Sequence, residues 1–259
     1  MLTDTHAHLN FPDFEEDLEA VLERAAEQDV RRILCIGTDL ASSRKALALA
    51  EAQAGLYATV GIHPHEARTA DEATLSQLRE WAQHPKVVAI GEIGLDFYRN
   101  LSPPEVQLRA FRAQIALAQE RNLPLVIHDR EAHEAVMAVL EEEEAWKLGG
   151  VLHCFSGDAT LAHKVTERGF YVGFDGPLTF PNARSLQALA AALPLQACLL
   201  ETDCPYLTPH PYRVQAPRQR NEPAYLRAVA EKMAELRGLS LAEVAAATSA
   251  NAERLFRLG

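Results

Sequence analysis

Short apolar runs alternate with longer amphipathic segments along the whole chain. The apolar runs are nearly continuous in Val, Ile and Leu, which is typical of strands that are buried on both faces of a parallel sheet. Eight runs predict strands at residues 2–8, 30–37, 57–63, 87–92, 123–128, 151–153, 170–174 and 198–201. The segments between them have the apolar spacing of helices that pack one face against a sheet.

Start and stop signals place several of these helices. Apolar residues at helical spacing predict a helix near residues 18–25 and a second over about 42–53, which Gly55 ends as a C-cap. Residues 69–72 resemble a capping box that opens the next helix.

Two further helix starts are marked more strongly. Ser102 is expected at an N-cap, with Pro103 in the first helical position and Glu105 in the third. Residues 240–243 form another capping box, so we expect a last helix that packs against the sheet.

Eight strand–helix units at this spacing predict an α/β protein with a single closed parallel barrel, the (β/α)8 or TIM barrel, over residues 1–259. An open, doubly wound sheet fits the regular alternation less well. Active sites of such barrels lie at the carboxyl ends of the strands, so ligand-type residues at strand ends carry more weight than others.

Composition limits the function classes. The formal net charge of −11 argues against a protein that coats nucleic acid nonspecifically, although bound metal ions can supply positive charge at a compact site. No apolar run is long enough to span a membrane and no signal peptide precedes the first strand, so we expect a cytoplasmic protein. The four cysteines lie in or beside apolar runs without C-x-x-C pairing, which favours reduced thiols.

Imidazole and carboxylate side chains gather at the predicted strand ends. His6 and His8 lie two residues apart on one strand and therefore point the same way. Such ligands suit Zn, Mn, Ni or Fe, and Mg where waters complete the shell. Strand alternation turns Cys154 away from the face of His153, so Cys154 is expected to be structural. The strand-end residues are His6, His8, His63, Glu92, His128, His153 and Asp203.

The chain resembles the TatD family of metal-dependent deoxyribonucleases through seven motifs spread nearly from end to end. These are D-x-H-x-H at 4–8, G-x-H-P-H at 61–65, G-E-I-G-L-D at 91–96, H-x-R at 128–130, H-C-F-S-G at 153–157, E-T-D-x-P-Y-L at 201–207 and R-N-E-P at 220–223. The resemblance implies a TIM barrel of the amidohydrolase type, a centre of two divalent metal ions (Mg, Mn or Zn), and hydrolysis of phosphodiester bonds in DNA.

The resemblance also implies roles for single residues. One metal ion would be held by His6, His8 and Asp203 and the other by His128 and His153, with Glu92 bridging them. His63, His65 and Asp96 would surround this centre or contact substrate. Asp203 would also orient the attacking water, which gives Asp203 and Glu92 the catalytic roles.

Two loops depart from the family pattern. Residues 213–220 form a longer loop than the usual compact basic run, and the usual serine and lysine are replaced within residues 173–181. Both departures affect the expected substrate preference more than the expected chemistry. Arginines that could contact phosphates are Arg130, Arg213, Arg218 and Arg220, although loop arginines are often merely solvated.

Two other functions fit parts of the pattern. The same barrel supports amidohydrolases that cleave a carbon–nitrogen bond of a small molecule, but Glu92 stands where many of those enzymes have a bridging carboxylated lysine. A non-catalytic module with a structural metal fits poorly, because structural zinc sites are usually closed and rich in thiolates. We therefore expect DNA as the partner, with no membrane association and no obligate protein partner.

Overall fold

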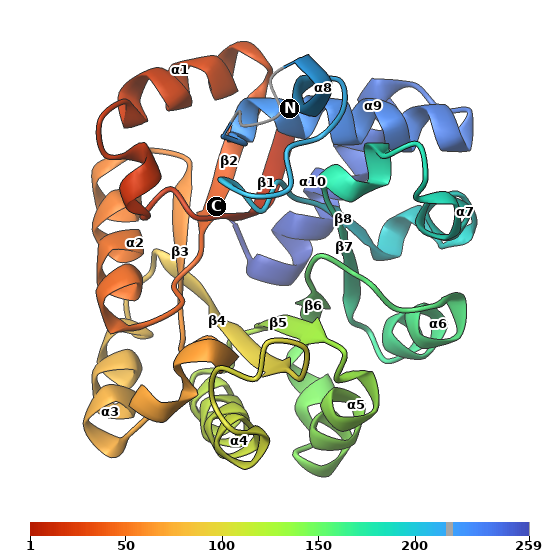
Figure 1. Cartoon of the computed structure of the whole chain (residues 1–259). Helices are drawn as coiled ribbons and strands as arrows, with labels where there is room; N and C mark the ends of the chain where they lie inside the picture. The colour runs from red at the N-terminus through yellow and green to blue at the C-terminus, as the bar shows by residue number, and fades with distance from the viewer. Residues whose placement is uncertain (216–219, 259) are drawn as a thin grey trace.

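Eight parallel strands form one sheet in the order of the sequence, and helices surround it (Figure 1). The structure is a computed structural model that describes residues 1–215 and 220–258. A backbone hydrogen bond of 2.8 Å from Asp203 N to His6 O, together with a parallel bridge between Ala7 and Cys204, brings the last strand beside the first. The strands are β1 (Leu2–Ala7), β2 (Val30–Cys35), β3 (Leu56–Val60), β4 (Val87–Asp96), β5 (Leu125–Arg130), β6 (Gly150–Leu152), β7 (Tyr171–Phe174) and β8 (Cys198–Leu200).

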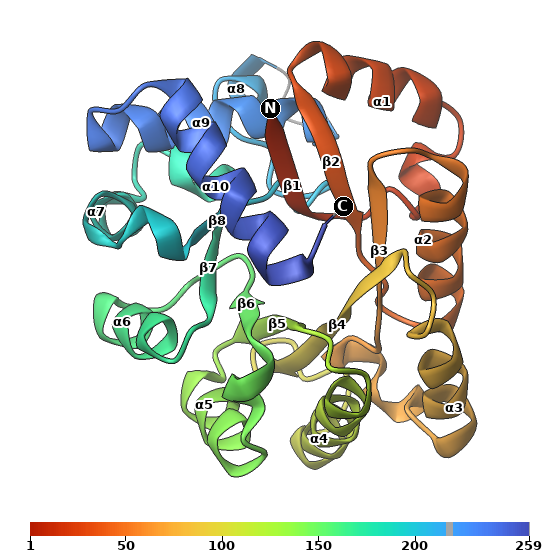
Figure 2. The same ribbon diagram turned by 180° about the vertical axis from the view of Figure 1, so that it is seen from behind.

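The helices lie outside the strands and alternate with them, which confirms the predicted TIM barrel (Figures 1 and 2). Their apolar faces and the outer faces of the strands form one large buried cluster. The helices are α1 (Leu18–Glu27), α2 (Leu40–Ala52), α3 (Glu72–Trp81), α4 (Pro104–Arg121), α5 (His133–Glu142), α6 (Ala159–Glu167), α7 (Arg184–Ala192), α8 (Tyr212–Gln215), α9 (Leu226–Arg237) and α10 (Leu241–Phe256).

Helix α10 packs at the amino ends of the strands (Figure 2). The side-chain amide of Asn251, on this helix, donates to the carbonyls of Leu195 and Cys198, where β8 begins. Phe256 joins a second buried cluster with residues of the strands. The predicted capping box at Ser240 is confirmed, and the helix it opens covers the end opposite to the candidate ligands.

Three helix starts differ from the sequence prediction. Asp71, rather than Thr69, caps α3, because Thr69 already belongs to a short 3-10 helix. Pro103 occupies the N-cap of α4, while the buried Ser102 hydroxyl donates to the carbonyl of His65 instead. Helix α2 starts earlier, at a capping box on Asp39, and ends at Gln53. Gly55 lies beyond it, with a positive φ of +82°.

Strand ends also differ from the prediction. β4 continues past Glu92 to Asp96, whereas β3 stops at Val60, before His63. Beyond Val60 the N–H groups of Gly61 and Ile62 donate to side chains instead of a strand. His63 then becomes the N-cap of a 3-10 helix that starts at Pro64. Within the described residues, no helix combines the length and hydrophobicity needed to cross a lipid bilayer.

Candidate metal centre

A first group of ligand atoms converges where β1 meets the loop after β8. The Nε2 atoms of His6 and His8 lie 3.3 Å apart, as expected for two residues on one face of a strand. Asp203 Oδ1 lies 3.6 Å from Nε2 of His6 and 3.3 Å from Nε2 of His8. Asp4 supports this arrangement because its carboxylate accepts hydrogen bonds from both the backbone N–H and the hydroxyl of Thr202.

Glu92 lies between this group and a second one. Its Oε1 lies 2.8 Å from both His128 Nδ1 and His153 Nε2. Its other oxygen, Oε2, lies 3.5 Å from Nε2 of His6 and 3.9 Å from Nε2 of His8. Each carboxylate oxygen thus faces a different set of imidazoles, so the geometry suits a carboxylate that two cations share.

Three further predicted residues lie against the second group. His63 Nε2 is 3.6 Å from Glu92 Oε1. Asp96 Oδ2 lies 2.8 Å from His65 Nε2 and 3.2 Å from His128 Nε2. The extension of β4 beyond Glu92 is what carries Asp96 to this position.

Glu201 is a buried neighbour of the centre to which the sequence reasoning assigned no role. Its Oε1 accepts the backbone N–H of Cys154 at 2.5 Å and lies 3.7 Å from His153 Nδ1. At this distance the carboxylate acts on the imidazole of His153 through its charge, because Nδ1 of His153 makes no hydrogen bond. Two sequence signals pointed to it: Glu201 ends an apolar run, and it is the first residue of the E-T-D-x-P-Y-L motif that contains Asp203.

Charges in the second group stabilise one another. Burial alone raises the pKa of Glu92, but His153 and His63, with hydrogen bonds from His128, bring it well below its usual value. Burial lowers the pKa of His153, yet Glu92 and Glu201 raise it well above the usual value. The carboxylate of Glu92 and the imidazoles that face it are therefore complementary in charge.

The first group differs in its protonation. Burial is the largest cause that lowers the pKa of His6, which favours the neutral imidazole that binds metals. Burial raises the pKa of Asp203, but the hydrogen bond from His8 and the charges of His6 and His153 together bring it below its usual value. By contrast, burial and the charge of Glu201 raise the pKa of nearby Asp175 to about 8, so Asp175 is largely protonated at neutral pH.

The donors fit divalent cations. The atoms of His6, His8 and Asp203 lie within 4.8 Å of one another, and so do those of His63, Glu92 and His128. Neutral imidazoles and carboxylates match the preferences of Zn and Mn. Cys154, expected to be structural, belongs to none of the candidate ligand groups among the described residues.

Gly173 on β7 leaves the space that Glu201 occupies. A Cβ at this position would lie 2.6 Å from each carboxylate oxygen of Glu201. We expect Gly173→Ala to displace Glu201 from His153, to lower the free energy of unfolding by about 1–3 kcal/mol, and to lower kcat of the folded fraction. Chemical denaturation and kcat per folded molecule measure the two effects.

Gly169→Ala is the matched control for this substitution. Gly169 has open space around it and a φ of +84°, so alanine strains the backbone without reaching the centre. Unchanged kcat in Gly173→Ala, with a loss of stability equal to that of Gly169→Ala, would contradict the role given to Glu201.

The predicted arginines are dispersed around the same end of the barrel. Arg130 lies over the ring of Tyr98 at 4.3 Å, and Arg213 over Phe180 at 4.7 Å. Arg220 makes two hydrogen bonds to Asp17, of 2.8 and 2.7 Å. Arg218 lies outside the described residues.

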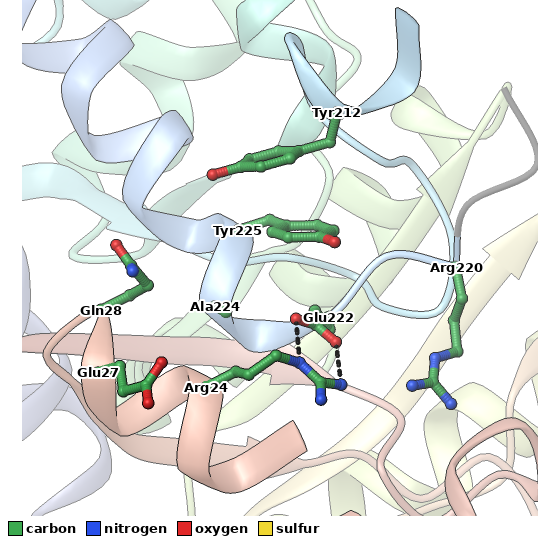
Figure 3. A pocket seen from close by; sticks show the side chains of 8 residues that line it. All are labelled: Arg24, Glu27, Gln28, Tyr212, Arg220, Glu222, Ala224 and Tyr225. Carbon is green, nitrogen blue, oxygen red and sulfur yellow. Dashed lines mark hydrogen bonds and ion pairs between the residues drawn. The ribbon is translucent and has the colours of Figure 1, made fainter. Parts of the chain in front are cut away.

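A pocket of about 650 Å³ lies between α1 and the segment after β8, away from the candidate ligands. In Figure 3, Tyr212 stacks on Tyr225 above the ion pair of Arg24 and Glu222. None of the residues that line this pocket belongs to the ligand groups, so the metal chemistry cannot be assigned to it.

Comparisons with known proteins identify the family of this chain. The sequence profile described as "TatD related DNase" matches residues 3–257. "Uncharacterized metal-dependent hydrolase YabD" of Bacillus subtilis is 45% identical over 258 residues, which cover 100% of both chains. "3'-5' ssDNA/RNA exonuclease TatD" of Erwinia tasmaniensis is 39% identical over 257 residues, 98% of this chain and 99% of the relative.

Solved structures show the same relationship. The crystal structure of YjjV, a TatD homologue from Escherichia coli K12, superposes with a TM-score of 0.92 at 34% identity. The match covers 100% of this chain and 98% of that one. With a family profile and homologous relatives that span nearly the whole chain, this protein belongs to the TatD family of metal-dependent hydrolases.

Proposed function

We propose that this enzyme is a deoxyribonuclease that hydrolyses phosphodiester bonds of DNA with two divalent cations. The observation that carries the proposal is the position of Glu92, whose two oxygens face two separate sets of imidazoles. A pair of cations on either side of one carboxylate suits phosphodiester hydrolysis, in which both the entering and the leaving oxygen need positive charge.

The distances support a division of the ligands into two sets. His6, His8 and Asp203 would hold one cation and His128 and His153 the other, with Glu92 shared. Asp96 would keep the ring of His128 in place through its contact with Nε2.

The bound cations would neutralise phosphate charge and make water more acidic. The chain itself supplies the remaining functions. Asp203 stays ionised at neutral pH and would orient the attacking water and accept its proton as general base. His63 and His65 lie beside the centre, where they would contact the substrate or hold the neighbouring carboxylates in place. The relative of Erwinia tasmaniensis named as a single-strand exonuclease supports this reaction class.

We expect two metal ions per chain in the purified enzyme. Six candidate ligands are too many for one ion that must also bind water. Elemental analysis after saturation with Mn and desalting measures the stoichiometry, and His153→Ala should lose one ion. His163, which is exposed on α6, provides the control substitution His163→Ala. One ion or none in the wild type, with His153→Ala unchanged, counts against the two-metal site.

The substrate is tested with metal-stripped protein and end-labelled DNA and RNA, single- and double-stranded. Mg, Mn and Zn are added separately, and the products are separated on a sequencing gel. Cleavage of DNA that depends on added metal supports the proposal, and the ladder distinguishes exonuclease from endonuclease action. A saturated enzyme that leaves every DNA substrate intact contradicts it.

A further inference from the structure

We propose that Tyr98, backed by Arg130 and Arg99, is a stacking site for a base of a single-stranded polynucleotide. The proposal rests on the proposed function, because it names how the substrate of that centre is held. The side chain of Tyr98 is 61% exposed, so it does not contribute to the core. Such exposure is unusual for a large aromatic side chain.

Two guanidinium groups lie over the ring of Tyr98. The guanidinium of Arg130 lies 4.3 Å from the ring centroid, and that of Arg99 lies 5.8 Å from it. Both arginines are exposed. An aromatic ring next to guanidinium groups combines the two features that single-stranded nucleic acid needs, a surface for base stacking and a charge for the phosphates.

The carboxylate of Asp96, which contacts the candidate metal centre, also holds the loop of Tyr98 in place. Oδ1 of Asp96 accepts the backbone N–H groups of Tyr98 at 3.0 Å and Arg99 at 2.7 Å. Oδ2 of Asp96 faces His128 and His65. The loop that carries the ring is therefore positioned relative to the candidate ligands, as a substrate subsite requires.

The loop is also tied to the neighbouring strand. Phe97 N donates to the carbonyl of Arg130 at 3.0 Å, so Tyr98 and Arg130 belong to one rigid pair of segments at the ends of β4 and β5. An exposed tyrosine fixed in this way loses little conformational freedom when a base stacks on it, which favours binding.

The opposite side of the centre is negatively charged and would repel a polyanion. Asp13, Glu15, Glu16 and Asp17 line a hollow beside α1, together with Arg220. Arg220 is already bonded to Asp17 there. The substrate strand is therefore expected to leave the metal centre over the ends of β4 and β5, where Tyr98 lies.

The test compares Tyr98→Ala with Tyr98→Phe and with Leu101→Ala. Leu101 lies in the same loop and is also 61% exposed, so its removal controls for the loss of an exposed apolar side chain. Base–aromatic stacking predicts that Tyr98→Ala raises both Kd and KM for a single-stranded oligonucleotide by about fivefold to a hundredfold. Tyr98→Phe and Leu101→Ala should resemble the wild type, and hydrolysis of bis-p-nitrophenyl phosphate should be unchanged in all three.

Arg130→Ala tests the phosphate contact separately. The slope of log Kd against log salt concentration should fall by about 0.7, the contribution of one contact to a single strand. A series of oligonucleotides with an abasic site at successive positions locates the stacked base. In the wild type, one of these positions should weaken binding. In Tyr98→Ala, an abasic site at that position should leave Kd unchanged, because the stacking contact is already lost.

The outcomes separate the two proposals. Equal Kd and KM for the wild type and Tyr98→Ala overturn the stacking site even if DNA is cleaved. Binding that depends on Tyr98 without any cleavage supports the stacking site and contradicts the deoxyribonuclease. A wild-type protein that neither binds nor cleaves oligonucleotides overturns both.

Discussion

Replacing Asp203 by asparagine is expected to lower kcat by about a hundredfold or more while the fold persists. Asparagine keeps the size of the side chain but loses the negative charge that holds a cation and accepts a proton from water. In the structure, Oδ1 of Asp203 lies within 3.6 Å of Nε2 of both His6 and His8, so its charge acts on both imidazoles of this group. Steady-state kinetics with saturating Mn measures kcat, and circular dichroism checks the fold.

Asp175→Asn is the matched control for this substitution. Asp175 is also buried at the carboxyl end of a strand, but its pKa of about 8 leaves it largely uncharged at neutral pH. Asparagine therefore replaces a neutral group with another of the same shape, and activity at pH 7 should change little. Wild-type kcat in a folded Asp203→Asn enzyme would remove the general-base role from Asp203.

The fold could be predicted because its signals are local. Each strand of the barrel is a short apolar run, and each helix has its own apolar face, so eight repeats of this pattern suffice for the topology. His6 and His8 could be paired from strand alternation alone, and their Nε2 atoms lie 3.3 Å apart. Helix starts were less predictable, because side chains such as that of Ser102 bond to a distant carbonyl instead of the next helix.

The contacts within the site that the strand pattern alone did not predict join distant segments of the chain. Glu201 faces His153 only because β6, β7 and β8 are in register and Gly173 has no side chain. Asp96 reaches His128 because β4 continues beyond the residue where the sequence pattern ended it. Neither relation has a periodicity that a single sequence displays, whereas family motifs bring such residues to attention without explaining their contacts.

Glu92→Gln is expected to weaken the binding of both cations, whereas Asp203→Asn affects only one, because the carboxylate of Glu92 faces both sets of imidazoles. Its Oε1 lies 2.8 Å from His128 Nδ1 and from His153 Nε2, and its Oε2 lies 3.5 Å from His6 Nε2. Glutamine keeps one carbonyl oxygen, but its NH2 group cannot bind a cation and the side chain carries no charge. Both cations should therefore be held more weakly.

We expect Glu92→Gln to retain fewer than two ions after desalting and to lose activity by at least about a hundredfold, the scale for removing one partner of a buried charge pair. His153→Ala should lose only one ion, which distinguishes a shared ligand from a ligand of one cation. Glu222→Gln is the matched control, because Glu222 is a buried glutamate that pairs with Arg24 outside the candidate ligand groups. It should keep both ions and lose stability alone, since its partner arginine loses a charged acceptor. Elemental analysis and kcat, measured on the same samples, test whether Glu92 is a shared ligand. Two ions and normal turnover in Glu92→Gln would show that the two sets of imidazoles do not share this carboxylate.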